Sequence, residues 1–282
     1  MAGAPGAAAR RVLRHAGGTA DAAMDLGAVA LALASLDRPD IALAPYERHF
    51  RKLTEDVAAY VAGTRAPTPL VLRHEALVQV IHRRHGYVGT EDSFDDVDAA
   101  NLTRVIDRRN GLPVAIGILY LHVCRKLGWT ASGVDFPGRF LLRLETDKGR
   151  VIFDGFDGGR EVSTPELRQM LKRMAGDHAE LSPAHYREAG PRAVLLRLQN
   201  NIKTRLLEAG QLKHASGILE TMVLLAPLES ELWRERAHLL AHQDLFTEAV
   251  ACMEEFLRLN RSSDDRYNAS ARLQEWRAHL DS

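Results

Sequence analysis

A nearly unbroken run of apolar positions between residues 114 and 127 predicts a helix that is buried on most sides. Its apolar members are Val114, Ile116, Ile118, Leu119, Tyr120, Leu121, Val123 and Leu127. A surface helix shows a single apolar stripe, whereas a helix that is apolar around its circumference is buried. Pro113 suits the first turn, where its missing N–H costs nothing, and Gly128 suits the C-terminal stop. We therefore expect a central helix on which the rest of the chain packs.

Helical periodicity precedes this segment and strand-like alternation follows it. Apolar residues spaced three or four apart predict helices at 25–36, 45–61, 70–85 and 99–109. Alternating positions predict strands at 131–136, 139–145 and 151–156, with a hairpin turn at 146–149. Helices first and strands later predict an α+β fold, in which the central helix packs on a small antiparallel sheet.

A repeat with a period of 34 residues begins near Pro191. Four apolar residues, Leu198, Leu206, Ala215 and Leu225, recur as Leu232, Leu240, Ala249 and Leu259. This is the period of tetratricopeptide helix-turn-helix units. A last helix is expected at 265–280. Two repeats are too few for an independent solenoid, so we expect this all-α region to dock on the α+β core.

Composition excludes several classes of protein. Lys plus Arg equals Asp plus Glu, 37 each, so no global field recruits nucleic acid or an acidic membrane. No apolar run reaches the roughly 20 residues that a membrane-spanning helix needs. Cys124 and Cys252 lie in helical apolar patterns and are interpreted as buried, reduced thiols of a cytoplasmic protein.

The first 23 residues are rich in Ala and Gly and are expected to be a disordered extension. Arg10, Arg11 and Arg14 precede an apolar run as in a signal peptide, but Asp21 and Asp25 interrupt the approach. Either Met1 or Met24 is a candidate start.

Three motifs carry a resemblance to a known family: Gly111-Leu112-Pro113 within RRNGLPVAIGILYLHVCRKLG, Pro137-Gly138-x-Phe140 within GVDFPGRFLLRLE, and the run VIFDGFDGG that ends at Gly159. They resemble the SirB-type branch of the transglutaminase-like superfamily, bacterial proteins that join a papain-like core to tetratricopeptide-like helices. The resemblance implies a transglutaminase-like α+β domain at 24–190 and a tetratricopeptide-like region at 191–282.

The same resemblance implies a thiolate nucleophile, a His base and an Asp that orients it. Position by position, the nucleophile falls on residues 113–115, the base on Arg139 and the acid on Asp154. No thiol or hydroxyl stands at 113–115, and a guanidinium stays protonated at ordinary pH, so Arg139 cannot be a base. Cys124 lies eleven residues farther along the same helix, roughly 16 Å along its axis.

We therefore expect no catalytic residues, with Arg139 and Asp154 as relic triad positions. The alternative for Asp154 is an ordinary aspartate at a turn before Gly155. We also predict that Arg139 and Asp154 form an ion pair that caps the central helix. Direct opposition on neighbouring strands would centre the hairpin between Thr146 and Asp147.

Neither a cofactor nor a metal is expected. The pairs His82 and His85, and His238 and His242, have spacings that could place two imidazoles on a metal, but no third ligand is evident, which favours solvated helix-face histidines.

Two functions stay open. The first is a pseudoenzyme, a protein- or peptide-binding regulatory module whose partner contacts the helical region. The second is a cysteine-type hydrolase or acyltransferase with a rearranged active site. The sequence indicates no oligomeric state.

Overall fold

The computed structural model describes residues 6–94 and 96–280, with the side chain of Val97 left out. The chain divides into two compact units. Among the described residues, the core unit holds 6–9, 20–94 and 96–198, and the helical unit holds 10–19 and 199–280. The division between the two units falls within helix α8, after residue 198, and the domain boundary expected at residue 190 stays a prediction.

In the core unit several helices precede the first strand of the sheet, which is the predicted α+β order. Its helices are α2 (Leu26–Asp37), α3 (Ala44–Gly63), α4 (Pro69–Leu77), α5 (Leu102–Arg108), α6 (Pro113–Lys126) and α7 (Thr164–Ala175), followed by the start of α8 (Pro191–Glu208). Short 3₁₀ turns lie at Asp21–Ala23, Glu91–Phe94, Val97–Ala100 and Pro183–Tyr186. A π-helical segment, Val78–Arg84, continues α4, so the single helix expected at 70–85 changes its winding halfway.

The sheet is antiparallel, with strand order β4-β3-β2-β1-β5. Its strands are β1 (Thr130–Phe136), β2 (Arg139–Thr146), β3 (Gly149–Asp154), β4 (Arg160–Glu161) and β5 (Glu188–Ala189). The third strand ends at Asp154, two residues earlier than expected. The two edge strands span only two residues each, too short for alternation to predict them.

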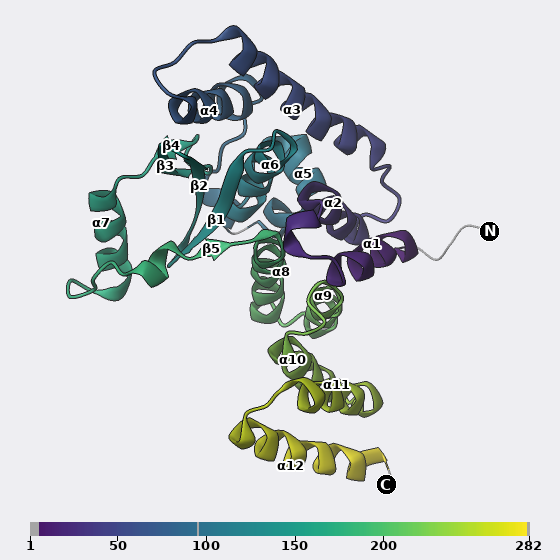
Figure 1. The fold of residues 1–282 in the computed structure, drawn as a ribbon. Helices are drawn as coiled ribbons and strands as arrows, with labels where there is room; N and C mark the ends of the chain where they lie inside the picture. Colours follow the sequence, from purple (N-terminus) through teal and green to yellow (C-terminus); the bar gives the residue numbers. More distant parts are fainter. Residues whose placement is uncertain (1–5, 95, 281–282) are drawn as a thin grey trace. The chain divides into compact units, whose positions relative to one another are not determined.

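Helix α6 is the buried centre of the core unit, as its apolar run predicted. Every residue from Val114 to Cys124 is buried, and α6 packs on β1 and β2 on one side and on α2 and α3 on the other (Figure 1). Gly117 and Gly133 both pack against the ring of Phe140, where a Cβ would lie within 3 Å of ring carbons. These glycines let the helix and the sheet approach closely.

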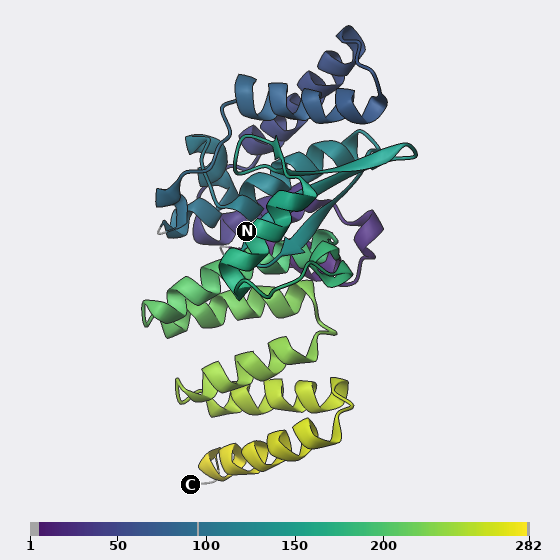
Figure 2. The ribbon, with the colours of Figure 1, turned by 90° about the vertical axis from the view of Figure 1, so that its left-hand side faces the viewer.

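The helical unit contains the paired helices that the 34-residue repeat predicted. Its elements are the end of α8, then α9 (Leu212–Leu225), α10 (Ser230–Ala241), α11 (Phe246–Leu259) and α12 (Ser263–Leu280). Figure 2 shows α10, α11 and α12 lying side by side. Their shared core is formed around Met253 and Phe256 of α11, with Trp276 of α12 packed against it.

A helix near the N-terminus, most of which belongs to the helical unit, lies where the sequence analysis expected a disordered extension. Residues 1–23 were expected to be disordered, but α1 (Ala7–Gly17) is an ordered helix, and residues 1–5 lie outside the described part of the chain. Leu13 is fully buried, and Arg10 pairs with Glu220 at 3.2 Å. A Cβ on Gly17 would lie 2.2 Å from the carbonyl oxygen of Leu224. Contacts distant in sequence, which composition does not reveal, order this helix.

None of the described helices is long and apolar enough to cross a membrane.

Candidate functional site

The start of α6 holds the position where the resemblance places a nucleophile, and it is apolar. Leu112 is the N-cap and provides no side-chain hydrogen bond to the helix. Pro113 opens the first turn, and Val114 and Ala115 are buried. A helix N-terminus favours a thiolate when a thiol is present, but this one presents only hydrocarbon side chains.

Arg139 and Asp154 form the predicted ion pair. Arg139 begins β2, Asp154 ends β3, and the guanidinium Nε lies 2.6 Å from the carboxylate Oδ2. Asp154 is only 1 % exposed, and its Oδ1 accepts hydrogen bonds from the N–H groups of Phe156, at 3.0 Å, and Asp157, at 3.3 Å. Both carboxylate oxygens are therefore bound by donors of the strand and the following turn.

The strand register that brings Arg139 and Asp154 together differs from the register expected from the sequence. Leu142 pairs with Phe153 and Thr146 with Gly149, so the hairpin is centred between Asp147 and Lys148. Arg139 and Asp154 are therefore diagonal neighbours on one sheet face, within reach of a long side chain. Among the described residues Asp154 accepts no hydrogen bond from the first turn of α6, so the predicted capping of that helix by the pair is wrong.

An aromatic side chain covers the ion pair. The guanidinium carbon of Arg139 lies 5.4 Å from the centre of the Phe156 ring. That ring rests on the backbone of Gly89, where a Cβ would lie 1.9 Å from a ring carbon, and its centre is 5.2 Å from that of Phe94. The N–H of Gly89 also donates to the carbonyl of Phe156 at 2.9 Å. The loop before α5 thus holds Phe156 over the Arg139–Asp154 pair.

Cys124 lies on α6 inside the core and is not reactive in this state. Burial raises the pKa of its thiol to about 12, which leaves very little thiolate at neutral pH. Cys252 is also buried, among the apolar residues of the helical unit.

The paired histidines of the sequence have separate partners. His82 Nδ1 lies 3.0 Å from the carbonyl oxygen of Tyr87, whereas His85 Nε2 lies 2.8 Å from Asp56 Oδ2. His238 packs its ring edge-on to Trp276, with 5.4 Å between the ring centres. Across residues 6–94 and 96–280 no group of three His, Cys, Asp or Glu is placed to hold a metal ion.

Sequence reasoning missed a half-buried polar cluster beside α5. Arg109 ends that helix in the left-handed region, at φ 60°, and its Nη1 donates to His49 Nε2 at 2.7 Å and to the hydroxyl of Tyr87. Burial, helped by the charge of Arg109, lowers the pKa of His49 to about 4, so the imidazole is neutral and can accept. A non-glycine residue in this conformation stores strain of about 1–3 kcal/mol. The helix predicted at 99–109 gave no signal of this cluster, because its partners His49 and Tyr87 lie far away in the sequence.

The fold and this site define an α+β domain in which helices precede an antiparallel sheet, with an Arg–Asp ion pair on β2 and β3, followed in the chain by tetratricopeptide-like helices. Residues 44–200 match the family model of the transglutaminase-like superfamily, and residues 202–274 match a tetratricopeptide repeat model. The chain therefore belongs to the transglutaminase-like superfamily.

Relatives occur in several bacteria. A UPF0162 protein of Xylella fastidiosa is 28 % identical over 223 residues, 77 % of each chain. A UPF0162 protein of Vibrio cholerae is 31 % identical over 135 residues, 48 % of this chain and 50 % of its own. Protein SirB1 of Salmonella typhimurium is 25 % identical over 177 residues, 63 % of this chain and 65 % of its own. No solved structure matches the chain.

Proposed function

We propose that this protein is a non-catalytic member of its superfamily that binds another protein or a peptide through its helical region. The observation that carries the proposal is the Arg139–Asp154 pair, with the nucleophile position at residues 113–115 filled by apolar side chains. In this proposal Arg139 and Asp154 are relic triad positions. Acyl transfer by a thiol needs a thiolate, a base and a group that orients the base, and only the last has a candidate here.

The helical region supports the binding half of the proposal. Repeats of the matched type generally provide surfaces for other proteins, and this unit exposes large apolar side chains. Leu228 is 78 % exposed and Tyr267 77 % exposed. Side chains of this kind are enriched where one protein contacts another, aromatic ones most of all.

The alternative is a cysteine-type hydrolase or acyltransferase that uses Cys124 in a rearranged site. A thiol-reactive acyl probe separates it from the proposal. We expect the native protein to stay unlabelled, and labelling to appear only when urea exposes the thiols. Labelling of native wild-type protein that disappears in Cys124→Ala, but persists in Cys252→Ala, would establish the alternative and overturn the proposal.

The binding half is tested by affinity capture from a bacterial lysate with point variants. Deleting residues 191–282 is a poor test, because it removes the start of α8 from the core unit and the packing partners of α1. Leu228→Asp and Tyr267→Asp change only exposed side chains of the helical unit. Val71→Asp, at an exposed apolar residue of the core unit, is the matched control.

We expect a captured protein that is lost with at least one helical-unit variant and retained with Val71→Asp. Capture that survives both helical-unit changes and fails with the control would place the binding surface on the core unit instead.

A further inference from the structure

A cavity of about 590 Å³ lies in the core unit among α2, α3 and α6. Buried Leu31 and Phe50 form part of its apolar wall, and exposed Ala28 and Ala58 lie closer to solvent. The other lining residues are Asp25, Glu47, Arg51, Thr54, Glu55, His122 and Lys126. This volume is within the roughly 300–1,000 Å³ typical of small-molecule sites. None of the lining residues belongs to the Arg139–Asp154 site.

One polar side chain in this wall has unused hydrogen-bonding capacity. His122, on α6, is 7 % exposed and also lines a neighbouring cavity of about 190 Å³. Its Nδ1 lies 3.8 Å from Asp25 Oδ1, beyond hydrogen-bonding distance, and within the described chain neither ring nitrogen has a hydrogen-bond partner. Neither ring nitrogen is among the fully enclosed polar atoms that lack a partner, so the imidazole faces the cavity space and can hydrogen-bond to a ligand there.

The neighbours of His122 hold the imidazole in place. Its ring packs on Phe50, with 4.2 Å between the ring centres. A Cβ on Gly27 would be 2.3 Å from His122 Nδ1. Gly27 stands in the first turn of α2, and its lack of a side chain leaves room for the imidazole.

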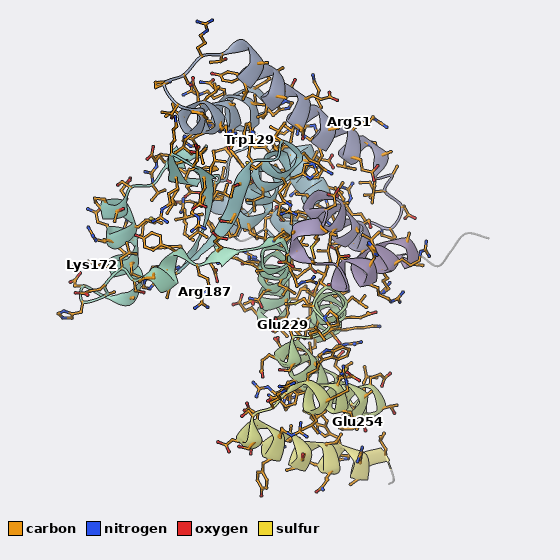
Figure 3. The ribbon with its side chains drawn as sticks, in the orientation of Figure 1. Arg51, Trp129, Lys172, Arg187, Glu229 and Glu254 are labelled. Carbon is orange, nitrogen blue, oxygen red and sulfur yellow. The ribbon has the colours of Figure 1, made fainter. Side chains whose placement is uncertain are left out.

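The charges around the opening indicate what kind of ligand fits. Three carboxylates, of Asp25, Glu47 and Glu55, face two cations, and Lys126 is already paired with Asp25 at 2.8 Å. Arg51, labelled in Figure 3, lies on α3 and is exposed. This excess of carboxylates over cations does not favour an anionic ligand. Burial lowers the pKa of His122 to about 4, so the imidazole is neutral and has one donor and one acceptor nitrogen.

We propose that this cavity binds an uncharged, largely apolar small molecule whose hydroxyl group hydrogen-bonds to the imidazole of His122. The apolar wall would hold the body of the ligand, and the imidazole would fix its orientation, as one well-placed polar group does in most small-molecule sites. The site would give the core unit a ligand of its own, independent of any partner bound by the helical unit.

The test compares two probes that differ by one hydroxyl, 2-naphthol and naphthalene, by titration of the full-length protein with ligand-observed NMR. We expect 2-naphthol to bind about two- to tenfold more tightly, the usual value of one net hydrogen bond. His122→Phe keeps the aromatic packing and should abolish that preference. The ¹⁵N resonances of the His122 ring should shift with 2-naphthol.

A blocking variant and its neighbour provide the matched control. Ala58→Trp fills the cavity from its exposed wall and should weaken both probes at least about tenfold, through loss of the apolar contact area. Ala59, one residue farther along, is exposed and does not line the cavity. Ala59→Trp should therefore leave both affinities within about twofold of the wild-type values, as surface changes usually do. If Ala58→Trp does not fold, Ala28→Trp, at the other exposed alanine, replaces it.

The proposal is overturned by any of three results: no saturable binding of either probe up to its solubility, equal effects of Ala58→Trp and Ala59→Trp, or a hydroxyl preference that persists in His122→Phe.

Discussion

Arg139→Met tests how much the Arg139–Asp154 ion pair contributes to stability. Methionine keeps much of the apolar length of the arginine and removes the cation, leaving Asp154 charged, buried and bound only by two backbone N–H groups. Removing one partner of a buried pair costs about 3–5 kcal/mol. The arginine side chain is 31 % exposed and the two N–H donors remain, so we expect a smaller cost, about 2–3 kcal/mol.

A double-mutant cycle separates the charge effect from the packing effect. Asp154→Asn keeps an oxygen that can accept from the N–H groups of Phe156 and Asp157, but removes the charge. If the cost of Arg139→Met is an uncompensated carboxylate, the double variant should be more stable than Arg139→Met alone, with a coupling energy of about 1–3 kcal/mol.

The assay is urea denaturation of the four proteins, with amide hydrogen exchange in β2 and β3 to localise the effect. A free energy of unfolding of Arg139→Met within about 0.5 kcal/mol of the wild-type value, the usual range of surface changes, would refute the argument. So would strictly additive effects of the two substitutions. Arg139→His should not produce hydrolase activity, because residues 113–115 still provide no nucleophile, and measurable turnover by that variant would contradict the proposed function.

Three other changes have expected outcomes. Leu119→Ala, in the fully buried centre of α6, should cost about 2–5 kcal/mol in urea denaturation, whereas a cost below about 1 kcal/mol would argue against a core position. Leu13→Ala should destabilise the helical unit by a similar amount, because Leu13 is fully buried. Removing residues 1–23 should lower the melting temperature of the helical unit in calorimetry, whereas an unchanged melting temperature would mean that α1 adds no stability. Burial holds the pKa of His122 at about 4, against about 6.5 in an unfolded chain, so the unfolded chain binds more protons between these values. Stability should therefore fall by about 3 kcal/mol as the pH drops from 6.5 to 4, and the pH profile of His122→Phe should lack that part of the slope.

The sequence predicted those parts of the fold that local pattern determines. Helix α6 was expected at 114–127 and spans Pro113–Lys126, because a continuous apolar run has one stable solution in a core. The hairpin pair Arg139 and Asp154 was expected in direct opposition and is diagonal. A register shift of two residues leaves every side chain on its original face, so alternation cannot distinguish the two arrangements, and the ion pair forms in either one.

The parts that the sequence did not predict depend on distant contacts. Leu13 is an isolated leucine in an alanine-rich segment, and only its burial in the helical unit marks α1 as ordered. His122 looks like one more member of a helical run, and its unpaired state appears only when α2 and α3 are placed around it. The left-handed backbone of Arg109 depends on His49 and Tyr87, 60 and 22 residues away.

The membership of α1 in the helical unit has a consequence for how the chain is synthesised. Arg10 leaves the ribosome early, but its partner Glu220 is 210 residues farther along. At about 5–20 residues per second, that interval is roughly 10–40 s. During this time α1 has an apolar face and no partner, while all the strands of the sheet are completed. Helix α1 is thus made before the strands of the sheet and packed after them, and until then Leu13 is available to chaperones.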